Sequence, residues 1–193
     1  MLFSNFEVYL KALNSQLKLN NKKIEFVVCG GTALNAMGLV YRTTKDIDVL
    51  GFVENNDDNI IIKKAIFPGW LKEIVSTISR DFNIPKDWLN SGPTSMIDLG
   101  LPTNFEKRLL RKEYGKNLSI YYISRIDQIY FKLYASVDRG GYHLNDLKKL
   151  NPDSDELYNA SKWCMTHDIS ERFKIVLKDL LEKTGYKNVS ERI

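Results

Sequence analysis

The stretch CGGTALNAMGLVYRTTKDIDVLGF, from Cys29 to Phe52, contains the two features that decide the fold. Adjacent glycines, Gly30 and Gly31, follow the apolar run IEFVVC, and two aspartates alternate with apolar residues in DIDVLGFV. Residues two apart on a strand point to the same face of a sheet, so we expect Asp46 and Asp48 to project side by side. Neighbouring carboxylates repel one another unless a proton or a cation lies between them. The pattern therefore predicts a strand that presents a cation site.

Several residues of this segment suit a nucleoside triphosphate and its metal. Carboxylate oxygens are ligands for Mg²⁺, or Mn²⁺ in its place, which takes the rest of its shell from water and phosphate. Gly30 and Gly31 end a strand and begin a helix, so backbone N–H groups can approach a phosphate without a side chain in the way. Thr32 adds a hydroxyl, and Arg42 precedes the acidic strand, where it can bind a triphosphate. The spacing fits neither a Walker loop nor a Rossmann fingerprint.

A third carboxylate, Asp98, lies in the apolar segment SMIDL at residues 95–99, which predicts another strand. If that strand lies beside the first pair, Asp98 completes a three-carboxylate metal site for two-metal phosphoryl transfer. In such a site one ion activates the attacking hydroxyl and both stabilise charge on phosphorus. The alternative is that Asp98 only caps the turn ahead of Gly100 and Pro102.

The pattern of apolar residues along the chain predicts an α+β front half followed by helices. Helices are expected at residues 4–18, 32–37, 70–82, 125–138, 143–150, 153–167 and 170–183, and a solvated basic helix face at 107–112. Strands are expected at residues 24–29, 46–53, 95–99 and 118–123, and a turn at 55–58. Asp153 and Ser170 are expected N-caps, and Gly185 ends the last helix. We expect an α/β core over residues 1–124 and a helical region over 125–193 that packs on it, or one domain that includes both.

Composition limits the classes of protein. The chain has 193 residues, of which 44% are hydrophobic, enough for a substantial core. The net charge of +4 permits a polyanionic partner without requiring one. Cys29 and Cys164 lack metal-spaced neighbours, which argues against zinc and favours a reducing compartment. No apolar run approaches the length of a membrane span and the first residues do not form a signal peptide, so we expect a cytoplasmic protein with no membrane partner.

Together, the motifs resemble the signature of the DNA polymerase β-type nucleotidyltransferases, and more closely that of their AbiEii-like minimal branch. The matching segments are GGTAL at 30–34, RTTKDID at 42–48, DQIYFKLYA at 127–135, and Arg139 followed by NDL at 145–147. The similarity covers roughly residues 24–150. It implies a nucleotidyltransferase-type mixed sheet flanked by helices and followed by a helical region.

The resemblance also implies roles for four residues. Asp46 and Asp48 would bind the metal, Lys132 would contact nucleotide phosphates, and Asp146 would act near the attacking group or orient Lys132. The residues by themselves leave alternatives open. Lys132 could be a lysine whose stem is buried and whose ammonium reaches solvent, and Asp146 could form a surface ion pair with a lysine at position 148 or 149.

These observations predict a Mg²⁺-dependent nucleotidyltransferase that moves a nucleoside monophosphate from an NTP to an acceptor and releases pyrophosphate. The resemblance favours a toxin-type enzyme that acts on tRNA or another macromolecule and has a cognate antitoxin as its partner. One alternative is a transferase that modifies a small molecule such as an aminoglycoside or a lincosamide. The other is a module that binds a nucleotide or a protein without turnover; lost metal ligands would mark it, but Asp46 and Asp48 are both present.

Overall fold

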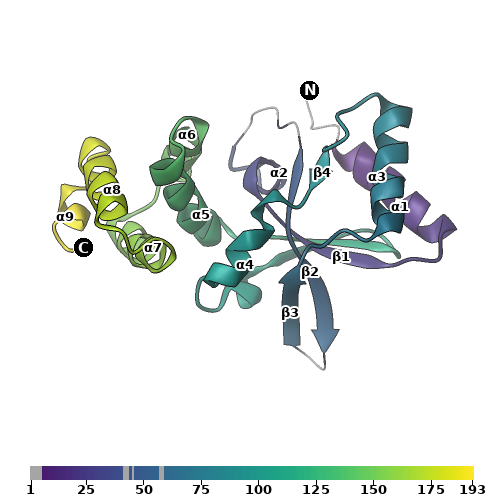
Figure 1. Ribbon diagram of the computed structural model, residues 1–193, viewed down its shortest axis with the longest axis horizontal. Helices are drawn as coiled ribbons and strands as arrows, with labels where there is room; N and C mark the ends of the chain where they lie inside the picture. Colours follow the sequence, from purple (N-terminus) through teal and green to yellow (C-terminus); the bar gives the residue numbers. More distant parts are fainter. Residues whose placement is uncertain (1–5, 41–43, 45, 57–58) are drawn as a thin grey trace. The chain divides into compact units, whose positions relative to one another are not determined.

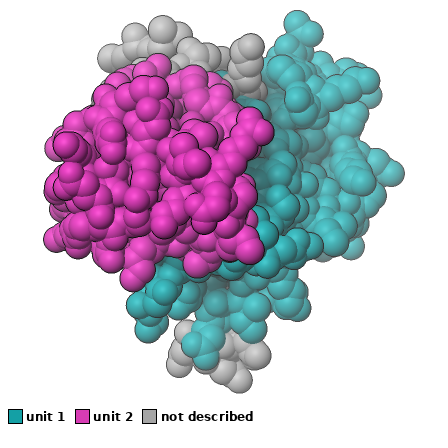
Figure 2. Space-filling view, turned by 60° about the vertical axis from the view of Figure 1, so that its left-hand side comes forward, with its two compact units in different colours: residues 1–123 teal, residues 124–193 magenta. Residues whose placement is uncertain are grey.

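The computed structural model describes residues 6–40, 44, 46–56 and 59–193, with the side chains of residues 55 and 56 left outside the description. The chain divides into two compact units, Met1–Ile123 and Ser124–Ile193, which are coloured separately in Figure 2. The first unit contains a mixed β-sheet flanked by helices, and the second is helical. The expected α+β fold class is thus confirmed.

The sheet of the first unit has strands that run in both directions. In the described part of the chain its strands are β1 (Ile24–Cys29), β2 (Ile47–Asn56), β3 (Asn59–Lys64), β4 (Leu89–Asn90), β5 (Leu110–Gly115) and β6 (Leu118–Tyr122). They follow the order β3-β2-β1-β6-β5, and the short β4 pairs with β2; Figure 1 labels β1 to β4. The pairs β1–β6 and β2–β4 are parallel, whereas β1–β2, β2–β3 and β5–β6 are antiparallel. This topology places the end of β1 beside the start of β2.

Two amphipathic helices, α1 (Phe6–Leu19) and α3 (Gly69–Phe82), cover one face of this sheet. Their buried stripes belong to the same apolar cluster as alternate residues of the central strands, including Phe26, Val28 and Ile120. Each fully buried apolar side chain of this kind contributes about 1.5–3 kcal/mol. The remaining helical elements of this unit are α2 (Gly30–Ala36), α4 (Met96–Leu99) and the 3₁₀ turns η1 (Gly92–Ser95) and η2 (Phe105–Arg108).

The second unit contains α5 (Arg125–Asp138), α6 (Tyr142–Lys149), α7 (Ser154–His167), α8 (Glu171–Lys183) and α9 (Lys187–Ser190). The expected N-caps are confirmed: the side chains of Asp153 and Ser170 accept the backbone N–H groups of Glu156 and Phe173. Along the described chain, we find no helix with the length and apolar character that crossing a bilayer requires.

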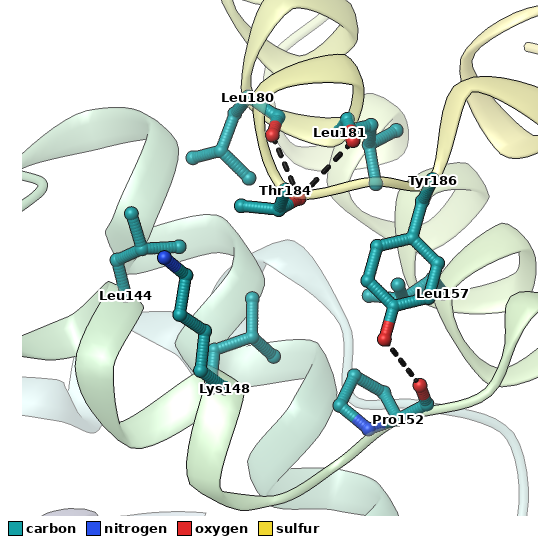
Figure 3. Close-up of a pocket in the computed structure, with 9 residues that line it drawn as sticks. Leu144, Lys148, Pro152, Leu157, Leu180, Leu181, Thr184 and Tyr186 are labelled. Carbon is teal, nitrogen blue, oxygen red and sulfur yellow. Dashed lines mark hydrogen bonds between the residues drawn. The ribbon is translucent and has the colours of Figure 1, made fainter.

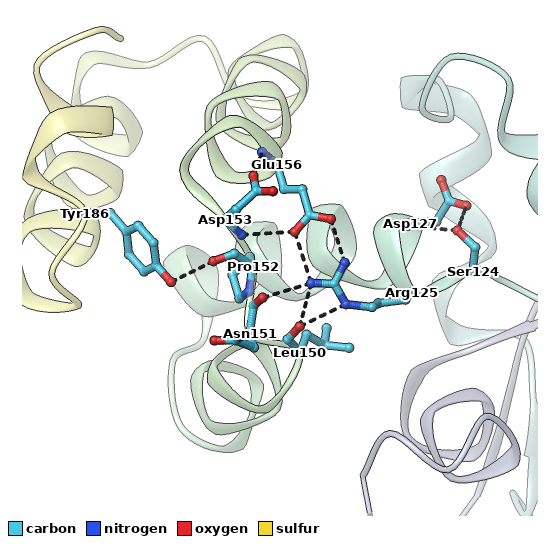
Figure 4. Close-up of polar contacts among 9 residues, drawn as sticks. All are labelled: Ser124, Arg125, Asp127, Leu150, Asn151, Pro152, Asp153, Glu156 and Tyr186. Carbon is cyan, nitrogen blue, oxygen red and sulfur yellow. Dashed lines mark hydrogen bonds and ion pairs between the residues drawn. The ribbon is translucent and has the colours of Figure 1, made fainter.

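Arg125 joins three helices of this unit, as Figure 4 shows. Its guanidinium donates to both carboxylate oxygens of Glu156, at 2.6 and 3.0 Å. It also donates to the carbonyl oxygen of Leu150, at 3.0 and 2.7 Å, and to that of Asn151, at 2.9 Å. Because Glu156 belongs to the capping box of α7, one arginine ties the start of α5 to the end of α6 and the start of α7.

The expected elements differ from the structure in several places, and β3, β4 and α9 were not expected at all. The strand expected at residues 95–99 is wrong, because residues 92–99 fold into η1 and α4; a five-residue apolar segment is too short for its periodicity to separate strand from helix. The basic helix expected at 107–112 is also wrong, since β5 begins at Leu110. β2 continues to Asn56 and β3 begins at Asn59, and the rest of the expected turn, at 57–58, lies outside the described residues.

Candidate active site

Gly30 occupies the point where β1 ends and α2 begins, and two constraints favour glycine there. Its φ of +70° lies in the left-handed region that residues with a side chain rarely adopt. A Cβ atom at this position would lie 2.5 Å from Oδ2 of Asp48, closer than real contacts allow. The missing side chain thus makes room for the carboxylate of Asp48. Gly31, the next residue, is buried in the first turn of α2.

Asp48 lies on β2 between two neighbouring strands. It is opposite Cys29 in the antiparallel β1–β2 pair and beside Asn90 in the parallel β2–β4 pair. The Nδ2 atom of Asn90 donates to Oδ1 of Asp48 at 3.3 Å. One carboxylate oxygen therefore faces the Asn90 amide and the other faces Gly30. Asp48 as a whole is partly buried.

Asp46 precedes β2 by one residue and is also partly buried, whereas Ile47 between the two aspartates is fully buried. The alternation agrees with two acidic side chains separated by a core residue. The backbone holds the segment at both sides: the N–H of Ile47 donates to the Trp88 carbonyl at 2.7 Å, and the Thr32 hydroxyl donates to the Asp46 carbonyl at 2.8 Å. The position of this acidic pair is thus fixed by α2 and by the segment before β4.

Thr32 has a different environment from the one expected. Its side chain is buried, and its Oγ1 lies 3.4 Å from that of Thr44 in addition to donating to Asp46. The hydroxyl therefore fastens the start of β2 to α2, and its contact with a phosphate stays a prediction. Arg42, the expected triphosphate ligand, lies outside the described residues.

The three-carboxylate cluster is not formed. Asp98 lies on α4, is 53% exposed and forms an ion pair with Lys64. The neighbouring Ile97 packs toward Gly51: a Cβ atom added to Gly51 would lie 3.0 Å from the Cδ1 atom of Ile97. Gly51 is three residues beyond Asp48 on β2. Within the described ranges, no group of three His, Cys, Asp or Glu residues is placed to hold a metal ion. The residue beside Asp48 on the adjoining strand is the neutral Asn90, which the sequence interpretation missed.

Lys132 and Asp146 form a buried ion pair within the second unit. The Nζ atom of Lys132, on α5, lies 2.9 Å from Oδ2 of Asp146, on α6, and the side chains are only 5% and 1% exposed. The ring of Tyr142 lies 5.6 Å from Nζ and adds a cation–π contact. Neither alternative for these residues is correct, because the lysine ammonium pairs with a buried carboxylate instead of extending into solvent, and the aspartate is not a surface partner. Asp146 holds the ammonium group of Lys132 directly.

The helical unit also contains a cavity of about 140 Å³, shown in Figure 3. It is lined by Leu144, Leu147, Lys148, Pro152, Leu157, Leu180, Leu181, Thr184 and Tyr186. Its hydroxyl groups are used internally, since Thr184 donates to the Leu180 carbonyl at 2.8 Å and Tyr186 to the Pro152 carbonyl at 2.8 Å. None of the expected site residues that the structure describes lines this cavity, so it is separate from the candidate site.

Comparison with known families agrees with the nucleotidyltransferase part of the resemblance. The model of the family described as nucleotidyltransferase of unknown function (DUF6036) matches residues 8–148. No curated protein and no solved structure matches the chain. The matched segment includes Asp46, Asp48, Lys132 and Asp146. It supports the nucleotidyltransferase superfamily without identifying the AbiEii-like branch.

Proposed function

Because the chain belongs to this family of nucleotidyltransferases of unknown function, we propose that it transfers a nucleoside monophosphate from an NTP to an acceptor. In this reaction an acceptor oxygen forms a bond to the α-phosphorus, and the bond from that phosphorus to the bridging oxygen of the β-phosphate breaks. Pyrophosphate leaves, and the acceptor proton passes to solvent or to a carboxylate. The observation that carries the proposal is the Asp48 carboxylate, which faces a glycine whose Cβ would collide with it.

The donor set fits a divalent cation. Asp46 and Asp48 are partly buried acidic residues on either side of a buried one, and the missing side chain of Gly30 makes room for the carboxylate of Asp48. Such oxygens match the preference of Mg²⁺ and Mn²⁺. When bound, the cation would supply charge neutralisation at the reacting phosphate and lower the pKa of the acceptor hydroxyl. The two aspartates would hold it, and the glycine would let a phosphate approach the backbone.

For Lys132 and Asp146 we propose the roles that the resemblance implies. Lys132 binds a phosphate of the nucleotide, and Asp146 keeps its ammonium group in place. The 2.9 Å buried pair supports the second role, because a held ammonium group loses little freedom on binding an anion. We propose a toxin-type enzyme with tRNA or another macromolecule as its acceptor and an antitoxin as its partner; the resemblance and the net charge of +4 support this choice.

The test is nucleotidyl transfer by the full chain. The protein is incubated with each α-³²P-labelled NTP, Mg²⁺ or Mn²⁺, and in turn total RNA, cellular protein, an aminoglycoside and a lincosamide. We expect label on RNA or protein, equimolar pyrophosphate, and a loss of at least about 100-fold in Asp48→Asn, since the substitution removes a charged group from the transition state.

Asp98→Asn is the matched control, because it removes an exposed carboxylate of α4 that pairs with Lys64 on β3. This variant should keep the wild-type rate. Label on a small molecule alone would replace the macromolecular acceptor with the small-molecule alternative. Binding of NTP without transfer to any acceptor, or full activity in Asp48→Asn, would overturn the enzymatic proposal.

A further inference from the structure

The short strand β4, just before η1, holds Asn90 beside Asp48. β4 contains only Leu89 and Asn90, which lie beside Ile47 and Asp48 in parallel register. The preceding residue, Trp88, is fully buried, and its indole Nε1 donates to the carbonyl of Val75 in α3 at 3.1 Å. Its own carbonyl accepts the N–H of Ile47. The backbone of Asn90 is therefore held between a core tryptophan and the strand that carries Asp48.

The orientation of the Asn90 amide is also determined. Its Oδ1 accepts the backbone N–H of Gly92 at 2.9 Å. An amide has an acceptor at one end and a donor at the other, so this contact assigns the NH₂ group to the opposite side. That side faces Asp48, and Nδ2 donates to its Oδ1 at 3.3 Å. The hydrogen bond thus has the polarity that favours an ionised carboxylate.

From this geometry we propose that Asn90 is a positioning residue of the cation site, and that it limits the site to two carboxylates. The inference rests on the proposed function. Asn90 fixes one oxygen of Asp48, and the other lies against Gly30, so the orientation in which the carboxylate would meet a cation is set from two sides. A ligand whose orientation is set by a neighbouring group binds a metal more tightly. The amide does so without adding charge beside Asp48.

Two substitutions separate positioning from charge. Asn90→Ala removes the donor and should weaken Mn²⁺ binding about tenfold or more. Asn90→Asp keeps an acceptor for the Gly92 N–H, which preserves the turn, but places a carboxylate where Nδ2 now lies. The new charge repels Asp48 in the absence of a cation and attracts a cation when one is present. Asn90→Asp should therefore bind Mn²⁺ more tightly than the wild type.

The measurement is Mn²⁺ binding to the full-length protein by electron paramagnetic resonance and calorimetry, with thermal unfolding followed with and without Mn²⁺. Asn188→Ala is the control, since it removes an amide that donates to Ser154 in the helical unit, at 3.0 Å. We expect the Mn²⁺-induced rise in Tm to be largest in Asn90→Asp, equal in the wild type and Asn188→Ala, and smallest in Asn90→Ala. A purely structural role would lower Tm equally with and without Mn²⁺.

The inference and the proposed function fail in different ways. Equal Mn²⁺ affinity in the wild type and Asn90→Ala, or no gain in Asn90→Asp, overturns the role of Asn90 even if nucleotidyl transfer is observed. The expected order of affinities without any transfer supports the role of Asn90 and removes the enzymatic proposal. An absence of Mn²⁺ binding to the wild type, with or without NTP, overturns the inference whatever the transfer assay shows.

Discussion

The two units contain acidic side chains in opposite environments. In the first unit Asp48 is partly exposed, and its contacts include an amide donor and the glycine at position 30. In the second unit Asp146 is 1% exposed and pairs with a lysine that is itself buried. Water stabilises the charge of the first carboxylate, whereas only protein groups can stabilise the second. We infer that Asp48 can exchange solvent for a bound cation, whereas Asp146 keeps Lys132 as a permanent partner.

The largest expected effect comes from breaking the buried pair. Asp146→Ala leaves the ammonium group of Lys132 buried without its carboxylate, which costs about 3–5 kcal/mol of folding free energy. Urea denaturation followed by circular dichroism measures this loss. The double variant Lys132→Met with Asp146→Leu should recover most of it, because a buried pair can be replaced by apolar residues of similar size at little cost. If the urea midpoint of unfolding is the same in Asp146→Ala and in the wild type, the buried ion pair does not stabilise the fold, and the contrast between the two carboxylates is wrong.

A smaller effect should follow from filling the space beside Asp48. Gly30→Ala puts a Cβ 2.5 Å from Oδ2 of Asp48 at a φ of +70°. The left-handed backbone costs about 1–2 kcal/mol, and displacing the carboxylate adds about 1–3 kcal/mol. The loss is again measured by urea denaturation. The variant should also lose Mn²⁺ binding.

Gly185→Ala is the matched control for this substitution. Gly185 also has a positive φ, +93°, but among the described residues no heavy atom lies within 4 Å of its added Cβ. It should therefore lose only the backbone part, about 1–2 kcal/mol. In an Asp48→Ala background, Gly30→Ala should cost the same as Gly185→Ala. A cost that stays high in that background would show that Gly30 serves the backbone turn alone and not the carboxylate.

The elements that the sequence predicted well are those with long periodic patterns. The residues of α1, α3 and α5 repeat apolar side chains over 14 positions each, and β1 is apolar except for Glu25. Local propensity and core burial agree in these segments, so their type could be read without the structure. The glycine turn and the acidic strand were also predictable, because each needs particular residue types at adjacent or alternate positions.

The rest depends on contacts between distant segments. Asn90 lies in a sequence of turn residues, LNSGP, and its role arises only when β4 pairs with β2 and places it beside Asp48. The sequence offered Asp98 as a third carboxylate of the site, but Ile97 beside it packs toward Gly51, another part of β2. β5 was mistaken for a helix because four of its six side chains are exposed, which conceals the strand alternation. Register and packing, not propensity, decide these positions.

The smallest expected effect concerns the stability cost of neutralising the open carboxylate. Asp48→Asn keeps the shape of the side chain and removes a charge that solvent reaches, so the free energy of unfolding without metal should change by less than about 1 kcal/mol. The same variant should lose the stabilisation that the wild type gains from Mn²⁺, measured as the shift in Tm on adding the ion. Asp146→Asn, tested in parallel, should lose stability equally with and without Mn²⁺, because its partner is a lysine of the same unit. If Asp48→Asn were as destabilising as Asp146→Asn in the absence of metal, Asp48 would be a structural anchor, and the distinction between an exchangeable and a permanent partner would no longer hold.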